Sequence, residues 1–116
     1  IASTFGANAI VKYRSIAPPV NNDSVLTDLL LECALPLIGK DNVIELDKPS
    51  LGAEDFADFL QDVPGTMFRL GVAGHDGCAP LHNGKFSLDE RSLEIGIKIL
   101  TSTLQAWLAR SSQYLN

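Results

Sequence analysis

The chain has 116 residues, of which 46% are hydrophobic and 20% are charged. This length excludes an enzyme of several domains and this composition excludes a disordered chain, so we expect one globular domain or a piece of a larger one. Lys and Arg number 9 against 14 Asp and Glu, which gives a formal net charge of -5. The negative charge repels a phosphate backbone and an anionic lipid surface, so we expect no nucleic-acid partner and no membrane partner.

The cysteines bear on the cellular compartment. Cys33 and Cys78 lie far apart and form no Cys-x-x-Cys pair, so they are predicted to be reduced thiols of a cytoplasmic protein. No apolar run reaches the ~20 residues of a membrane span, and no basic segment followed by an apolar core marks a signal peptide. The sequence begins at Ile1 instead of Met, from which we expect a segment of a longer protein.

Several segments are predicted to be β-strands. β-branched and aromatic residues alternate with polar ones over residues 8–14, which predicts a strand with one solvated face. Pro18 and Pro19 then interrupt any helix or central strand and mark a crossover or a domain boundary. Residues 43–46 are a short strand candidate, and residues 66–72 are almost continuously apolar, as in a strand buried on both faces of an α/β sheet. The predicted fold class is therefore α/β.

Helices are predicted between these strands. The first begins at a cap formed by Asn22 or Asp23 and ends at Gly39, with Pro36 distorting its last turn. Its apolar residues fall on one helical face: Leu26, Leu29, Leu30, Cys33 and Leu37. A second helical run covers residues 53–63 and is stopped by the Pro-Gly pair that follows it.

The final helix has the clearest pattern. Ser87 and Glu90 form a capping box that predicts its start. Its apolar residues then step by three or four positions: Leu93, Ile97, Leu100, Leu104, Trp107 and Leu108. This spacing predicts a helix of about six turns that packs one apolar stripe on a core.

A glycine-rich loop over residues 73–86 follows the buried strand and carries both histidines, His75 and His82. Function in α/β folds lies in such loops, and imidazole is both a common metal ligand and a general base near neutral pH. A metal site needs three or four ligands, and no His-x-x-x-His or Glu-x-x-His pair supplies them locally. Two loop histidines are ordinary in a chain of 116 residues, so on position alone the interpretation without a role is favoured. A hydrolase using Cys78 and His82 is disfavoured, since no third orienting residue or oxyanion site accompanies the pair.

The turn over residues 50–56 is a second candidate site. Gly52 opens a helix whose free backbone N–H groups can bind an anion. Glu54 and Asp55 place negative charge at the same helix end, which argues against a phosphate ligand. A helix whose acidic first turn complements its dipole explains these residues without any ligand.

Short motifs, taken in order, resemble the C-terminal part of metal-dependent amidohydrolases of the aminoacylase and carboxypeptidase type. This group includes N-acyl-amino-acid hydrolases, hippurate hydrolases and indoleacetyl-amino-acid hydrolases. The motifs are Ala-Pro-Pro-Val-Asn-Asn (17–22), Leu-Gly-Ala-Glu-Asp-Phe (51–56), Val-Pro-Gly (63–65), Leu-Gly-Val (70–72) and Pro-Leu-His (80–82), with the final helix after them. The resemblance covers nearly the whole chain.

The resemblance implies a parent with two domains. Residues 1–17 would end a lid or dimerisation domain, and residues 18–116 would form the C-terminal part of a catalytic domain with a dinuclear site for Zn, Mn or Co. By the family pattern His82 is a metal ligand. Gly52, Glu54 and Asp55 are candidates for lining the substrate site. No catalytic residue is expected in this segment, because the general base and the other ligands of such enzymes come from upstream motifs.

The implied reaction is metal-assisted hydrolysis of the amide bond of N-acyl amino acids, in which cations activate water and polarise the acyl carbonyl. Since one ligand does not make a site, we expect the chain to be inactive alone. Its expected partners are a small N-acyl amino acid and the rest of the parent enzyme, which would form a homodimer through the lid. The alternative is a non-catalytic acidic α/β interaction module that binds a partner through an exposed apolar patch.

Overall fold

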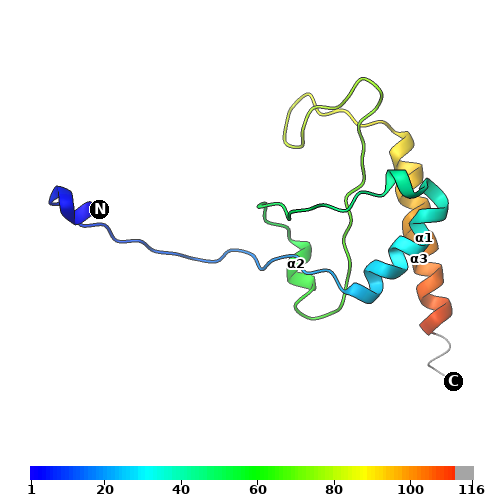
Figure 1. The fold of residues 1–116 in the computed structure, drawn as a ribbon, viewed down its shortest axis with the longest axis horizontal. Helices are drawn as coiled ribbons and strands as arrows, with labels where there is room; N and C mark the ends of the chain where they lie inside the picture. The colour runs from blue at the N-terminus through cyan, green and yellow to red at the C-terminus, as the bar shows by residue number, and fades with distance from the viewer. Residues whose placement is uncertain (112–116) are drawn as a thin grey trace.

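The computed structural model describes residues 1–111, so residues 112–116 of the predicted catalytic segment lie outside the described part. The molecule is elongated, measuring 68 × 47 × 23 Å, and its N-terminal residues extend away from the helices (Figure 1). Its elements are η1 (Ala2–Phe5), α1 (Ser24–Ile38), η2 (Lys40–Asn42), α2 (Phe56–Phe59) and α3 (Arg91–Ser111). None of the helices described is long and apolar enough to cross a membrane.

Helix α1 confirms the predicted start and end. Asp23 is the cap, and its carboxylate accepts a hydrogen bond from the backbone N of Leu26 at 2.9 Å, which satisfies one of the free N–H groups at the helix start. Pro36 lies within the last turn, and Gly39 ends the helix with φ at 79°. Glycine tolerates such a positive φ without steric cost. These signals are local, which is why the sequence predicts this helix well.

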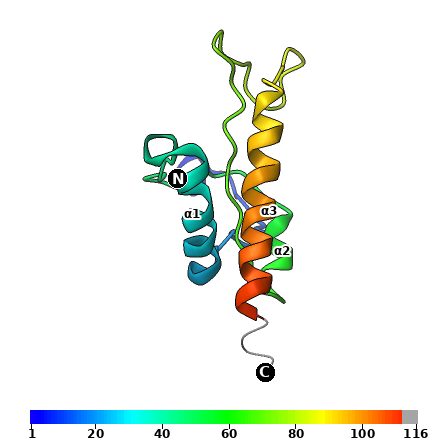
Figure 2. The same cartoon turned by 90° about the vertical axis from the view of Figure 1, so that its right-hand side faces the viewer.

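Helices α1 and α3 lie side by side, with the segment of residues 66–72 running along them (Figure 2). Leu30 and Ala34 of α1 and Ile99 of α3 form the buried cluster, and Ile38 and Phe68 pack against it. The cluster joins elements from three parts of the chain, so it is the main apolar contact that holds the helical part together.

The apolar stripe predicted to pack on the core is exposed, so that prediction is wrong. Its six residues are between 46% and 65% exposed: Leu93, Ile97, Leu100, Leu104, Trp107 and Leu108. The buried face of α3 consists instead of Ser92, Gly96 and Ile99. Gly96 lets the neighbouring segment approach closely, since a Cβ there would lie 2.9 Å from Leu70 Cδ2. Periodicity identified the apolar face of the helix, but small residues determine which face is covered.

The predicted capping box at the start of α3 is also wrong. The helix begins at Arg91, whose backbone N donates to Asp89 Oδ1 at 3.0 Å. The backbone N of Asp89 is held by Val72 O at 2.9 Å, and Ser87 O accepts from the Cys78 thiol at 2.9 Å. Because these contacts fix residues 87–89 outside the helix, the cap moves from Ser87 to Asp89.

The second predicted helix is shorter than expected. Only Phe56–Phe59 are α-helical, against a predicted run over residues 53–63. Turns closed by hydrogen bonds between residues three positions apart flank this short helix. Ala57 N donates to Glu54 O at 3.1 Å, and Gln61 N donates to Asp58 O at 3.2 Å. Such i to i+3 bonds are typical of helix ends, so much of the predicted run forms turns.

The predicted strands are not strands within residues 1–111. Residues 8–14, 43–46 and 66–72 carry no strand assignment, and the described part shows a single isolated bridge, between Gly74 and Gly77. A strand is defined by hydrogen bonds to a neighbour, and these segments do not pair with one another. The α/β fold and the last strand of a lid domain are therefore not confirmed.

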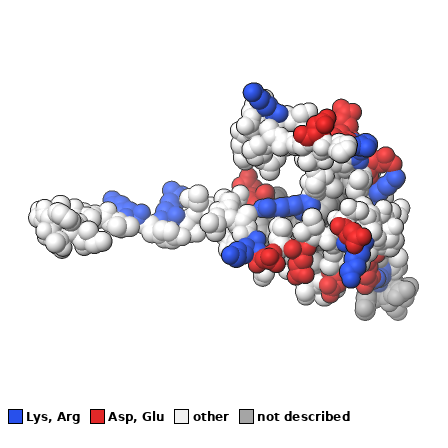
Figure 3. All heavy atoms as spheres, turned by 45° about the horizontal axis from the view of Figure 1, so that its top comes forward, with Lys and Arg blue, Asp and Glu red and all other residues white. Residues whose placement is uncertain are grey.

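Charged side chains of both signs are interspersed over the helical part (Figure 3). Arg110 of α3 and Glu32 of α1 form an ion pair at 2.5 Å between the two packed helices. The charged side chains of residues 1–22, the segment that precedes α1, are both basic: Lys12 and Arg14. Cys33 and Cys78 are both free thiols, in agreement with the prediction.

Candidate functional site

The histidine loop, residues 73–86, is closed at its base by hydrogen bonds. Asp89 N donates to Val72 O at 2.9 Å across the base, whereas Gly77 N donates to Gly74 O at 3.0 Å in a turn within the first arm of the loop. The Cys78 thiol donates to Ser87 O at 2.9 Å and thereby joins the two arms of the loop. The loop thus leaves the helical part from a defined root.

His82 lies in a tight turn within this loop. Asn83 N donates to Pro80 O at 3.3 Å, and Lys85 N donates to the side chain of Asn83 at 2.9 Å. Among the described residues, His82 is the only residue other than glycine with a positive φ, at 65°. Residues other than glycine adopt this conformation rarely, and such positions are frequent at functional sites. The residue is exposed, which leaves its imidazole accessible to a ligand.

The described residues do not complete a metal site. Within residues 1–111, no group of three or more His, Cys, Asp and Glu side chains lies close enough together to hold an ion. A stable site needs three or four ligands. His82 can therefore serve as one ligand at most, and the donor set of the described chain alone does not fit a bound metal.

The Cys78 and His82 pair is not assembled as a nucleophile and base. The thiol hydrogen of Cys78 is directed at carbonyl oxygens, those of Ser87 at 2.9 Å and Ala79 at 3.2 Å. A nucleophile and its base must be within hydrogen-bond reach of each other, and the described contacts of Cys78 do not include His82. The structure gives the thiol a role in loop closure.

The turn with Gly52, Glu54 and Asp55 is exposed and lies apart from the histidine loop. All three residues are exposed, and a Cβ at Gly52 would meet nothing within 4 Å. The carboxylate of Glu54 accepts a long hydrogen bond from Phe56 N at 3.5 Å, at the start of α2. Figures 1 and 2 show α2 apart from the histidine loop, which lies near the start of α3. The structure therefore does not bring the predicted site residues together.

Asn22 makes a contact that the sequence did not predict. Its side-chain amide donates to Met67 O at 2.8 Å and accepts from Met67 N at 2.9 Å. Asp23 N donates to Gly65 O at 2.8 Å, and Thr27 Oγ1 lies 2.9 Å from Thr66 Oγ1. The start of α1 is thus joined to the segment that leads to the histidine loop. The sequence indicates Asn22 as a possible helix cap and as the last residue of the motif over residues 17–22, but not this contact.

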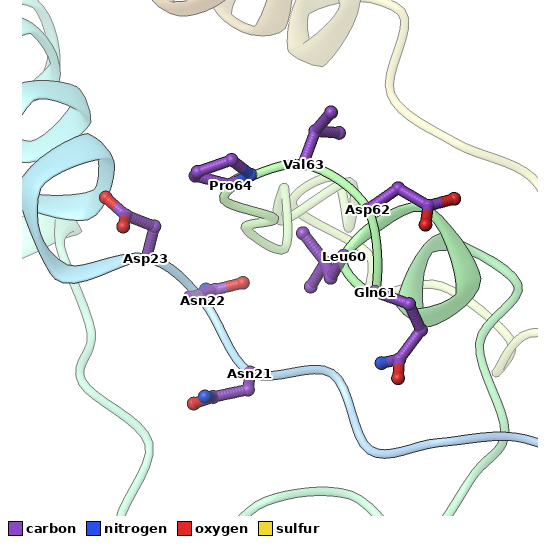
Figure 4. Close-up of a pocket in the computed structure, with 9 residues that line it drawn as sticks. Asn21, Asn22, Asp23, Leu60, Gln61, Asp62, Val63 and Pro64 are labelled. Atoms are coloured by element: carbon purple, nitrogen blue, oxygen red, sulfur yellow. The ribbon is translucent and has the colours of Figure 1, made fainter.

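A shallow cavity of about 330 Å³ lies beside this junction, between residues 21–23 and residues 60–65. In Figure 4 the side chains of Asn22 and Leu60 point toward one another, whereas the carboxylates of Asp23 and Asp62 point apart. Acid–base chemistry needs titratable groups directed at a common point. We therefore interpret this cavity as a gap between two neighbouring segments and not as a site of acid–base chemistry.

The ionisable groups with clear shifts lie at the start of α3. The Arg91 guanidinium, which forms an ion pair with the carboxylate of Asp89, holds the pKa of Asp89 at about 2. The same pairing raises the pKa of Arg91. Lys98 hydrogen-bonds to Glu94 at 2.5 Å and lowers the pKa of that carboxyl. The first pair lies where the loop meets α3 and the second lies within α3, and neither includes a predicted site residue.

Comparisons with known proteins match most of the chain. The sequence profile of peptidase family M20/M25/M40 matches residues 7–106. A probable hydrolase of Synechocystis sp. is 38% identical over 92% of this chain and 27% of its own length. Thermostable carboxypeptidase 1 of Saccharolobus solfataricus is 38% identical over 83% of this chain and 24% of its own. N-acetyl-L-cysteine deacetylase of Bacillus subtilis is 34% identical over 80% of this chain and 21% of its own.

The chain therefore spans about a quarter of the length of these curated relatives. No solved structure gives a significant match.

Proposed function

Because the chain belongs to peptidase family M20/M25/M40, we propose that it contributes the C-terminal part of a hydrolase that cleaves the amide bond of N-acyl amino acids. The observation that carries this proposal is the family match over residues 7–106. The carboxypeptidase and the deacetylase among the relatives are both named for amide cleavage. The resemblance of the motifs to N-acyl-amino-acid hydrolases supports the choice of substrate class.

Peptidases of this family generally depend on divalent metal ions, and the proposal assigns one ligand to this chain. His82 is exposed, has a left-handed backbone and lies on a loop with a closed base. The remaining ligands would come from outside these 116 residues, since the described part supplies no further cluster. On this proposal the chain alone is inactive, and the catalytic groups are supplied by the rest of the enzyme.

Gly52, Glu54 and Asp55 are proposed to line the substrate site of the complete enzyme. Their exposure at the start of α2 leaves them free to meet another part of the protein. Residues 1–17 are proposed to end a lid domain through which the enzyme forms a homodimer. Their extended and largely exposed course, away from the helices, supports this division of the chain (Figure 1).

A hybrid enzyme tests the proposal. Residues 7–106 of this chain replace the matched segment of the Bacillus subtilis deacetylase, and hydrolysis of N-acetyl-L-cysteine and bound metal are measured. We expect turnover that depends on a divalent metal. His82→Ala should lower kcat/KM by about 100-fold and reduce the bound metal, because a missing ligand weakens the site.

The matched control is His75→Ala, which alters the other histidine of the same loop. It should leave kcat/KM within about threefold of the hybrid, because His75 is not proposed as a ligand. Equal activity and metal content in the His82 and His75 variants would remove the ligand assignment. A folded hybrid that binds metal but hydrolyses no N-acyl amino acid would remove the proposed reaction.

A further inference from the structure

One hydrogen bond joins the two arms of the histidine loop beyond its root. Between residues 73–79 and residues 84–88, the described part of the chain contains a single hydrogen bond, from the Cys78 thiol to Ser87 O at 2.9 Å. A thiol has one hydrogen to donate, and this contact is shorter than the 3.2 Å to the carbonyl of the adjacent Ala79. The position of the second arm relative to the first therefore depends on Cys78.

The first arm is itself fixed against the root of the loop. Gly74 lies beside Asp89, since a Cβ at Gly74 would lie 3.4 Å from Asp89 Oδ2. Gly77 ends the turn that follows, with φ at 83°, a conformation that glycine adopts without steric cost. Its backbone N donates to Gly74 O at 3.0 Å. Cys78 comes directly after this turn, so its thiol projects from the anchored part of the loop.

Apolar packing does not hold the remainder of the loop in place. Residues 80–87 are all exposed, and the large apolar side chain of Leu81 is 71% exposed. A segment with few buried apolar contacts has little local stability unless hydrogen bonds restrain it. The hydrogen bonds of this segment therefore determine how well it is ordered.

His82 has a backbone conformation that needs such restraint. Its φ of 65° is left-handed, which is unfavourable for a residue with a side chain and persists only where the surrounding contacts fix it. The hydrogen bond across its own turn, from Asn83 N to Pro80 O, is long at 3.3 Å. This turn is therefore a weak restraint by itself.

We propose that Cys78 is a positioning residue, whose hydrogen bond to Ser87 O holds the turn with His82 in one conformation. The bond joins residues nine positions apart, with His82 between them. Without it, the next closure is the root at Val72 and Asp89, and a longer loop leaves its residues more conformations. The inference rests on the proposed function for the role of His82, whereas the order of the turn is a property of this chain alone.

Nitrogen-15 relaxation of the 116-residue chain measures the order of the turn. In the unmodified chain we expect amide order parameters of about 0.8 for residues 81–86, as in a rigid backbone. Cys78→Ala removes the donor and should lower these values below about 0.6, while the values in α1 stay unchanged. Cys78→Ser keeps a hydroxyl donor on the same Cβ and should restore the values to within about 0.1 of the unmodified chain.

Cys33→Ala is the matched control, because it removes the other free thiol, which lies on α1. It should leave the order of residues 81–86 unchanged. Values below about 0.6 in the unmodified chain would overturn the proposal without any substitution. Equal order in Cys78→Ala and the unmodified chain would also overturn it, as would a serine variant as mobile as the alanine variant.

The deacetylase hybrid connects the turn to the proposed reaction. In the hybrid, Cys78→Ala should lower kcat/KM by about 10-fold, because residues that orient a functional side chain contribute about 10- to 100-fold. Cys78→Ser should stay within about threefold of the unmodified hybrid. Unchanged kcat/KM in an alanine variant with a mobile turn would overturn the positioning role. A hybrid without any turnover counts only against the proposed function, since relaxation of the chain then decides the role of Cys78.

Discussion

The side-chain amide of Asn22 pairs with both backbone groups of Met67, donating to the carbonyl at 2.8 Å and accepting from the N–H at 2.9 Å. The two residues are 45 positions apart in the chain. The contact fixes the start of α1 against the segment that ends at the histidine loop. A side chain thus performs the pairing that a neighbouring strand would otherwise supply.

Asn22→Ala should lower the free energy of unfolding by about 1–2 kcal/mol, because two hydrogen bonds are lost and the backbone of Met67 is left unpaired. Urea unfolding followed by circular dichroism measures the change. The control is Asn21→Ala, an exposed neighbour for which we expect a change within about 0.5 kcal/mol. Equal effects of the two variants would show that the amide contact contributes nothing to stability.

The contrast between α1 and α3 shows which features could be predicted from the sequence. The cap at Asp23 and the end at Gly39 depend on residues within one helical turn, and the structure confirms both. The covered face of α3 depends instead on how closely residue 96 can approach Leu70, which is a tertiary property. Glycine and serine carry no signal in a hydrophobic pattern, so periodicity pointed to the wrong face.

The candidate site was predictable only in part for a related reason. His82 was singled out by its motif and loop position, and its left-handed backbone is a property that the sequence does not display. Its role as a ligand stays a prediction, because the described residues do not bring other donors to it. The Asn22 and Met67 pairing was missed because no local pattern links residues so far apart.

Two isoleucines of α3 give a direct test of which face is covered. Ile99 is 2% exposed and Ile97 is 65% exposed. Ile99→Ala should lower the free energy of unfolding by about 2–4 kcal/mol through lost burial and a cavity. Ile97→Ala should change it by no more than about 0.5 kcal/mol, as measured by urea unfolding. A larger loss at Ile97 would restore the stripe predicted from the sequence.

Gly96 should resist enlargement. Gly96→Leu places a side chain where Leu70 already lies 2.9 Å from the position of a Cβ, and overpacking of this kind costs about 1–3 kcal/mol. The gain in helix propensity, about 0.8–1 kcal/mol, offsets only part of that cost. The control is Thr101→Leu at an exposed position of the same helix. If Gly96→Leu raised the midpoint of thermal unfolding, the close contact between α3 and residues 66–72 would be disproved.

The Asp89 and Arg91 pair should make stability depend on pH only in acid. Pairing lowers the folded pKa of Asp89 from 3.8 to about 2. A carboxyl with a lowered folded pKa stabilises the fold above its unfolded pKa, and this contribution is lost as pH falls from about 4 through about 2. Carboxyl titration by NMR should give a midpoint near 2 for Asp89, and Arg91→Ala should move it back toward 3.8. The matched control is Lys98→Ala, which removes the partner of Glu94 and should leave the Asp89 midpoint unchanged. An Asp89 midpoint near 3.8 in the unmodified chain would show that the ion pair does not form in solution.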